Sequence, residues 1–339
     1  MFANKYSKGW AVSELSINEQ ADKRPWIRYL GWITISLLAA LLVNNFLNIY
    51  FGFEKATSLF SSLSFTGIVT LIVYFACISI AVWQTHRTMG ESFRSQAKKL
   101  HDFNVYFLRG CFFAVLLIGC VDFLLALLRS IDVLVYIVDE QTARALGLGN
   151  FVGPYVHVPL IIVGFVCAYF SKTLGWTWLA LLIVFAELII VISRFVFSYE
   201  QSFMADLVRY WYAALFLFAS AYTLYDEGHV RVDVFYAGLS DKIKAYVNAW
   251  GSILLGVLTM VVIVFIGFNG KTSIINSPLL VFEITNQGST GMFIKYQMAM
   301  FLGVFGATML VQFISQFFDS IADINGEPGK RDTSIKLGN

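Results

Sequence analysis

The sequence predicts an all-α integral membrane protein with about eight transmembrane helices, and its composition supports this class in two ways. Of the 339 residues, 58% are hydrophobic and only 14% are charged, whereas soluble domains contain about 25% charged residues. A chain with so few charged side chains cannot cover a water-facing surface, so lipid must cover much of it. The formal net charge is only +2, so we expect no nucleic-acid partner.

Eight apolar segments of roughly 19 to 24 residues are long enough to cross a hydrocarbon core of about 30 Å. They cover residues 30–50, 65–84, 107–128, 153–171, 177–198, 207–225, 247–268 and 295–318. A tight turn is expected at Lys172–Trp176, which alone separates the fourth span from the fifth. The spans form two consecutive four-helix halves. The predicted divisions are a tail of residues 1–29, the halves 30–175 and 176–320, and a tail of residues 321–339.

Basic residues predict the orientation of these spans. With the N-terminus inside, the inside segments contain 16 Lys and Arg residues and the outside loops contain 4. The positive-inside rule therefore places both tails in the cytoplasm. Residues 1–29 lack the short apolar region and small-residue cleavage site of a secretory signal peptide, so the first span is expected to remain as an anchor.

No residue pattern indicates catalysis or a cofactor. The four histidines, at positions 86, 101, 157 and 229, do not have metal-ligand spacing, and there is no Walker loop or dinucleotide-binding fingerprint. All four cysteines fall inside predicted spans, where small packing residues are the expected role. We therefore expect a protein that is not an enzyme and has no metal or cofactor.

Charged residues inside the spans are the usual indication of a transport path. Glu187 and Arg194 are seven residues apart on the fifth span and share one helix face. Asp122 and Arg129 have the same spacing on the third span. Such residues line an ion or substrate path or hold a partner helix; the second role is favoured, because so few charges cannot build both a substrate site and an ion site.

The polar segment between the sixth and seventh spans is expected at the inner membrane surface. Here His229, Arg231 and Asp233 alternate with valines, which places polar groups on one side of an extended strand-like piece. From Ser240 onward apolar residues recur at helical spacing, so an amphipathic helix lying in the interface is predicted, with Ser240 or Asp241 as its cap. This segment serves either as a lipid anchor or as a docking surface for a partner protein.

From about residue 176 to 320 the chain resembles the small membrane subunit, of the DctQ type, of tripartite ATP-independent periplasmic (TRAP) transporters. The resemblance rests on the segments Ser193–Phe197 and Tyr210–Val247, and GHVRVDVFY within the second segment is its most specific part. Glu283, Gly288, Lys295 and Gln312 match weaker family positions. The family's Gly-Leu-Pro before this lysine is replaced by Gly291-Met292-Phe293, and its outer-loop Trp is missing.

The resemblance implies a multi-pass protein of the bacterial inner membrane whose role is not catalytic. In this family the small subunit packs against the large elevator-type permease subunit and anchors it. The large subunit carries the substrate and sodium sites, and a periplasmic binding protein delivers the solute, commonly an organic acid. The expected partners are these two proteins and membrane lipids. The residues expected at the partner interface are Glu187, Arg194, His229, Arg231, Asp233 and Lys295.

Two alternatives remain open at this point. A stand-alone secondary transporter would need Glu187, Arg194 and Asp122 to line one cavity. A membrane anchor of a redox complex would bind haem or quinone, which the histidine pattern does not favour. The four spans of residues 30–175 carry no motif that identifies a role; enlargement of the scaffold, or binding of lipid or another subunit, is expected.

Overall fold

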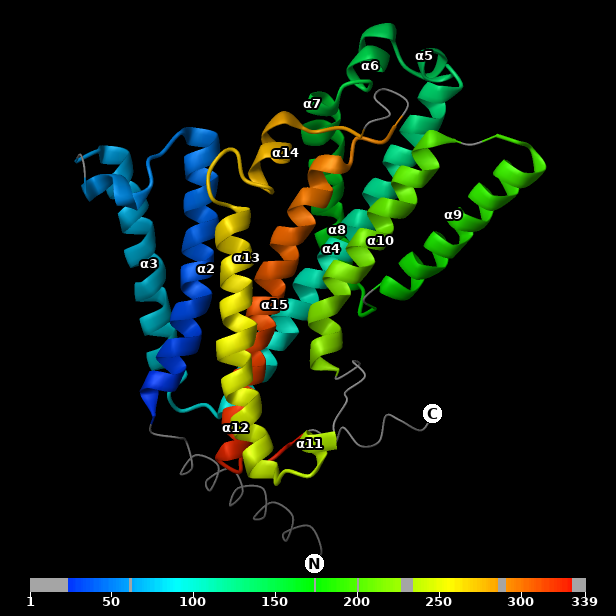
Figure 1. The fold of residues 1–339 in the computed structure, drawn as a ribbon. Coiled ribbons are helices and arrows are strands. Elements are labelled where there is room, and N and C mark those ends of the chain that lie inside the picture. The colour runs from blue at the N-terminus through cyan, green and yellow to red at the C-terminus, as the bar shows by residue number, and fades with distance from the viewer. Residues whose placement is uncertain are drawn as a thin grey trace, which may run out of the picture. The chain divides into compact units, whose positions relative to one another are not determined.

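A computed structural model describes residues 24–60, 63–173, 175–199, 201–226, 234–285 and 291–330 (Figure 1). All of its longer elements are helices. They are α2 (Pro25–Phe51), α3 (Phe65–Arg87), α4 (Phe93–Ser130), α8 (Val158–Phe170), α9 (Trp176–Val196), α10 (Ser202–Tyr225), α12 (Asp241–Gly251), α13 (Leu258–Gly267) and α15 (Lys295–Ile324). The short helices are η1 (Ala56–Phe60), α5 (Leu134–Ile137), α6 (Glu140–Ala145), α7 (Gly149–Val152), α11 (Val234–Ala237) and α14 (Asn276–Val281), and two π-helical turns occur, η2 (Gly153–His157) and η3 (Ser252–Val257). The described part of the chain contains no β-strand.

Seven helices in the described residues are long and apolar enough to cross a membrane. They correspond to seven of the eight predicted spans, and two of them are continuous through a π-helical turn: Gly149–Phe170 and Asp241–Gly267. The remaining predicted span is α10, a helix of 24 residues that is less apolar because it contains Asp206, Arg209 and several tyrosines. The protein is thus an all-α integral membrane protein.

The separation of the fourth and fifth spans is as predicted. Helix α8 ends at Phe170 and α9 begins at Trp176. Gly175, the residue before α9, has a φ of +79°, a left-handed conformation that glycine adopts at no steric cost. The reversal of the chain therefore depends on this residue.

In the structure, the helix predicted to lie in the membrane interface is not separate from the span that follows it. Ser240 is the N-cap of α12, as expected. However, α12 continues through η3 into α13 and forms the beginning of one 27-residue helix, Asp241–Gly267. The π-helical turn keeps the backbone helical, so nothing separates the amphipathic part from the span.

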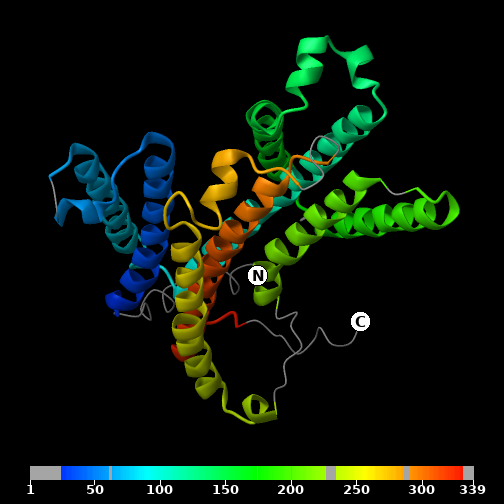
Figure 2. The same ribbon diagram turned by 45° about the horizontal axis from the view of Figure 1, so that its top comes forward.

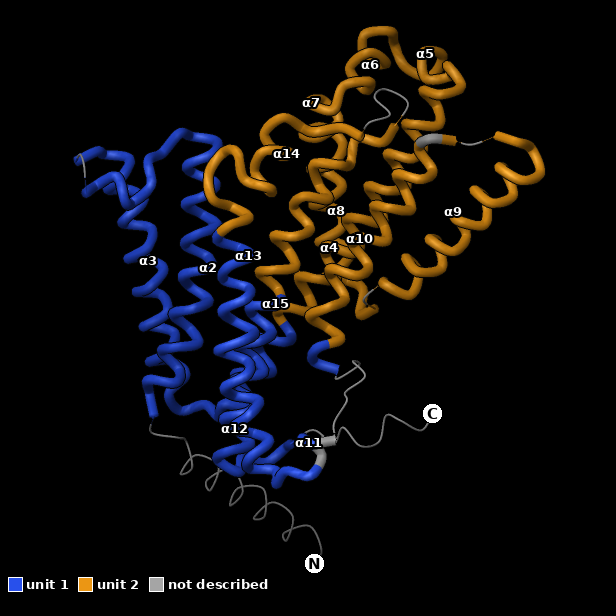
Figure 3. The backbone as a smooth tube through the Cα atoms, in the orientation of Figure 1, with its two compact units in different colours: residues 1–102, 224–265, 309–339 blue, residues 103–223, 266–308 orange. Residues whose placement is uncertain are grey.

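The structure contains two compact units (Figure 3). Unit 1 comprises residues 1–102, 224–265 and 309–339, and unit 2 comprises residues 103–223 and 266–308. Each unit therefore draws on both of the predicted consecutive halves. Unit 1 takes α2 and α3 from the first half and residues 224–265 from the second, and α4 and α15 contribute to both units.

In unit 1, α2 and α3 pair as a helical hairpin and lie side by side in both views of the ribbon (Figures 1 and 2). The buried Arg28 of α2 donates hydrogen bonds to the backbone carbonyls of Thr88 and Glu91 and lies over the ring of Phe93 at 4.1 Å. A guanidinium buried in this way satisfies carbonyls that the end of α3 and the following turn leave without helical partners.

The start of α4 and the end of α15 are joined by ionic contacts within unit 1. Arg94 lies 2.6 Å from a carboxylate oxygen of Asp319 and 2.6 Å from one of Asp323. The carboxylate of Glu327 accepts hydrogen bonds from the backbone N–H groups of Phe93 and Arg94. Because Glu327 accepts hydrogen bonds from N–H groups in the first turn of α4, its negative charge complements the positive end of the α4 dipole.

In unit 2, the loop that follows α4 is built from the short helices α5, α6 and α7. Asp139 caps α6: its carboxylate accepts hydrogen bonds from the backbone N–H of Thr142 at 2.9 Å and from the Thr142 hydroxyl at 2.7 Å. These bonds to the charged form lower the pKa of Asp139.

Candidate functional site

Two of the predicted interface residues, Glu187 and Arg194, are exposed on α9. Neither makes a hydrogen bond or ion pair with another described residue. Only a narrow stripe of α9, formed by Leu179, Ile183 and Ala186, is buried. The charged residues therefore lie on the outward side of a helix that is otherwise apolar.

Lys295 forms an ion pair with Glu283, with 2.5 Å between Nζ and Oε1. Both side chains are about 40% exposed, so this pair contributes little to stability. The remaining predicted residues, His229, Arg231 and Asp233, lie outside the residues that the structure describes, as does Gly288.

Replacing Lys295 with glutamine is expected to lower the free energy of unfolding by less than about 1 kcal/mol, because exposed ion pairs rarely exceed that value. Thermal unfolding of the purified protein in detergent would measure it. Glu283→Gln should give the same small change. A loss several times larger would mean that the pair contributes more than a solvent-screened contact.

The most concentrated polar chemistry in the described chain is a buried network in unit 2. It joins Asp122 of α4, His157 of η2, Tyr210 of α10, and Tyr296 and Gln297 of α15. Asp122, His157 and Tyr210 are each 0% exposed. Polar groups buried inside an apolar protein persist only when they satisfy one another, so the network specifies how these four helices pack.

The hydrogen bonds of His157 define which of its ring nitrogens is the acceptor. The Gln297 amide nitrogen lies 2.8 Å from Nδ1 of His157, and an amide nitrogen can only donate. Nδ1 is therefore the acceptor in this hydrogen bond, and Nε2 is the ring nitrogen that carries a proton. Nε2 lies 3.5 Å from Oδ1 of Asp122. These two atoms have no other partner among the described residues, so each faces the other.

The network also holds the segment that precedes α15. Asp122 accepts a hydrogen bond of 2.7 Å from the backbone N–H of Phe293, and Asp206 accepts one of 3.3 Å from that of Met292. Arg129 donates to the carbonyl of Gly291 at 2.9 Å and lies over the Phe293 ring at 4.2 Å. We call residues 291–293 the clamped segment. Two carboxylates and one guanidinium thus fix three consecutive residues.

At the clamped segment, the sequence differs from that of the transporter family it resembles. Gly291-Met292-Phe293 stands in place of the Gly-Leu-Pro of that family. The departure has a clear consequence: a proline at position 293 would have no N–H to donate to Asp122. Phe293 both supplies this N–H and presents its ring to Arg129. The side chains that hold the clamped segment come from α4, in the first predicted half, and from α10, in the second. Both predicted halves therefore contribute to this site.

Only some residues of this site can be identified from the sequence. Asp122 and Arg129 stand out in the sequence as charged residues of the third span, and His157 falls inside the fourth. No sequence pattern marks Asp206, Tyr210, Tyr296 or Gln297. The general rule that polar residues inside membrane helices find partners could have identified them as candidates. It could not have paired them, because Asp122 and Phe293 are far apart in the sequence.

The geometry of the network is that of a structural clamp. Among the described residues, no group of three or more His, Cys, Asp or Glu side chains could hold a metal ion. Asp122 is fully buried in the network while Glu187 and Arg194 are exposed on α9. These three residues therefore do not line one cavity, as a stand-alone transporter would require.

Comparison with known proteins gives one match. Residues 180–323 match the family described as "Tripartite ATP-independent periplasmic transporters, DctQ component". Neither the curated proteins nor the solved structures give a match. The matched range includes α10, the clamped segment and α15 up to Asp323, and it does not include α2 to α8.

Proposed function

We propose that the chain, whose residues 180–323 match the DctQ component family of the TRAP transporters, is the small permease subunit of such a transporter. In this proposal it packs against the large elevator-type subunit and anchors it in the bacterial inner membrane. The complex would carry out sodium-coupled uptake of an organic acid or related solute that a periplasmic binding protein delivers. The family match is the observation that carries this proposal, since the matched family consists of transporter components.

The exposed charges of α9 support a protein partner in the membrane. Charged side chains inside the bilayer are costly and normally pair with other polar groups. Glu187 and Arg194 have no such partner among the described residues of this chain. We propose that this face of α9 meets the large subunit and that His229, Arg231 and Asp233 add a docking surface at the membrane interface.

The role of the chain is proposed to be that of a scaffold and not of an enzyme. The most buried polar groups of unit 2 are occupied with one another and with the clamped segment. The asymmetry of 16 inside against 4 outside basic residues supports cytoplasmic tails at both ends.

Purification from the native membrane tests the proposal. The tagged full chain is extracted in mild detergent and the co-purifying proteins are identified by mass spectrometry. We expect a large TRAP permease of about a dozen spans in stoichiometric amount. A homo-oligomer or monomer with no such partner would overturn the proposed function.

Charge reversal on α9 tests the interface. The variant Glu187→Lys with Arg194→Glu is expected to lower recovery of the large subunit by about tenfold or more, because mispaired charges at a desolvated interface cost several kcal/mol. Lys98→Glu, an exposed residue on α4, is the matched control and should leave recovery unchanged. Full recovery with the α9 variant would place the partner on another face.

A further inference from the structure

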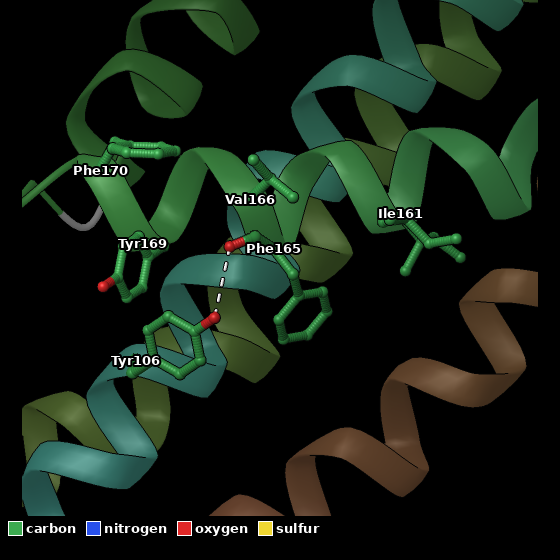
Figure 4. Close-up of a pocket in the computed structure, with 7 residues that line it drawn as sticks. Tyr106, Ile161, Phe165, Val166, Tyr169 and Phe170 are labelled. Atoms are coloured by element: carbon green, nitrogen blue, oxygen red, sulfur yellow. Dashed lines mark hydrogen bonds between the residues drawn. The ribbon is translucent and has the colours of Figure 1, made fainter.

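A shallow groove of about 450 Å³ lies along α8 in unit 2 (Figure 4). Its lining is apolar or aromatic: Tyr106 of α4 with Ile161, Ile162, Phe165, Val166, Tyr169 and Phe170 of α8. The Tyr106 hydroxyl donates a 3.4 Å hydrogen bond to the carbonyl of Phe165, which holds this ring against α8. This contact holds one wall of the groove in place.

The dimensions of the groove match one leaflet of a bilayer. From Ile161 to Phe170, α8 rises about 14 Å at about 1.5 Å per residue. Half of a hydrocarbon core of about 30 Å is nearly the same length. An extended hydrocarbon chain lying along α8 would therefore remain within one leaflet over the whole groove.

A positively charged group lies at the Phe170 end of the groove. Arg109 is half-buried, and its Nη1 donates a 3.4 Å hydrogen bond to the carbonyl of Ala168. This is the guanidinium's one hydrogen bond to a described residue, and its Nε is buried without a partner. A guanidinium carries five N–H donors, so this cation is strongly under-satisfied for its position in a membrane helix.

The same end has the residues of a membrane–water interface. Lys172 is exposed two residues beyond the end of α8, and Tyr169, Trp176 and Trp178 are exposed beside it in the sequence. Aromatic side chains of this kind gather at the level of lipid headgroups. A ligand whose tail occupies the groove would therefore place its head near Arg109 and Lys172.

We propose that this groove binds one acyl chain of an anionic phospholipid whose phosphate pairs with Arg109 and Lys172. The apolar lining accounts for the tail, and the under-satisfied guanidinium accounts for the charge of the head. Such a site gives residues 30–175 a role that the DctQ domain does not supply: a lipid-binding surface on α4 and α8.

Lipid retention by the purified full chain tests the site. The protein is exchanged into nanodiscs of phosphatidylcholine with one-fifth phosphatidylglycerol, released, and examined by native mass spectrometry. We expect phosphatidylglycerol to be retained in preference to phosphatidylcholine. Arg109→Gln and Lys172→Gln should each lower this retention by about fivefold, as expected for one basic residue near a lipid phosphate.

Two matched controls separate the site from general effects. Val166→Phe fills the groove and should lower retention, whereas Val163→Phe, exposed on the same helix outside the groove, should not. Lys242→Gln, an exposed lysine in unit 1, should retain phosphatidylglycerol fully. Equal retention of the two lipids, or unchanged retention in both Lys172→Gln and Val166→Phe, would overturn the proposal. So would displacement of the lipid by millimolar inorganic phosphate, which would indicate an anion site without a tail.

Discussion

Replacing Asp122 with alanine is expected to lower the free energy of unfolding by about 3 kcal/mol, since it removes one member of a fully buried polar pair. The change removes the acceptor that lies 2.7 Å from the backbone N–H of Phe293. It also removes the carboxylate oxygen that lies 3.5 Å from Nε2 of His157. Each abandoned buried donor costs free energy, and little water can enter to replace the carboxylate. Thermal and denaturant unfolding of the purified protein in detergent, followed by tryptophan fluorescence, would measure the loss.

The matched control is Asp102→Ala, an exposed aspartate on the same helix. It is expected to change the free energy of unfolding by less than about 0.5 kcal/mol. Combining Asp122→Ala with His157→Ala should give a loss clearly smaller than the sum of the single losses, because the two groups face each other. Additive losses would mean that Asp122 and His157 act independently. A small loss for Asp122→Ala alone would mean that the contacts of Asp122 with the clamped segment do not stabilise the protein.

Substituting Gly164 with valine is expected to destabilise the protein by about 1 to 3 kcal/mol or more through overpacking. A Cβ at Gly164 of α8 would lie 2.6 Å from the backbone nitrogen of Ala114 and 2.7 Å from its Cα. These are backbone atoms of α4, so relief requires the two helices to separate. In membranes small residues of this kind permit close helix packing, because lipid provides no hydrophobic force to compensate for lost contact.

Gly251→Val provides the comparison for this prediction. Gly251 lies in α12, and a Cβ there would meet nothing within 4 Å. The same substitution should therefore leave the unfolding temperature nearly unchanged or raise it slightly. If both variants lose equal stability, the loss would reflect the valine itself and not the contact between α4 and α8.

The positions of the spans could be predicted because the membrane imposes a one-dimensional requirement: about 20 consecutive apolar residues. The beginning of α4 shows the limit of this rule. The predicted spans 65–84 and 107–128 leave residues 85–106 as a loop, yet residues 93–106 are helical. Phe93, Ala97 and Leu100 recur there at helical spacing and are buried. A hydropathy criterion does not detect an amphipathic extension of a membrane helix.

The sequence could predict some residues of the candidate site, but not which of them contact one another. The seven-residue spacing predicts that Glu187 and Arg194 share one face of α9, and in the structure both are exposed. Asp122 and Arg129 have the same spacing on the third span, and in the structure both contact the clamped segment. Helical periodicity indicates which residues share a face, and it contains no information about which distant segment that face meets.

The sequence by itself determined the membrane class, the positions of the helices and the resemblance of residues 180–323 to the DctQ component family, since each depends on local composition or on a contiguous motif. Tertiary structure alone decided the two interleaved units, the clamp of Asp122, Asp206 and Arg129 on residues 291–293, and the groove on α8. The physical reason is that a buried polar group selects its partner by geometry in three dimensions. Here the carboxylate of α4 is satisfied by a backbone N–H more than 170 residues away along the chain.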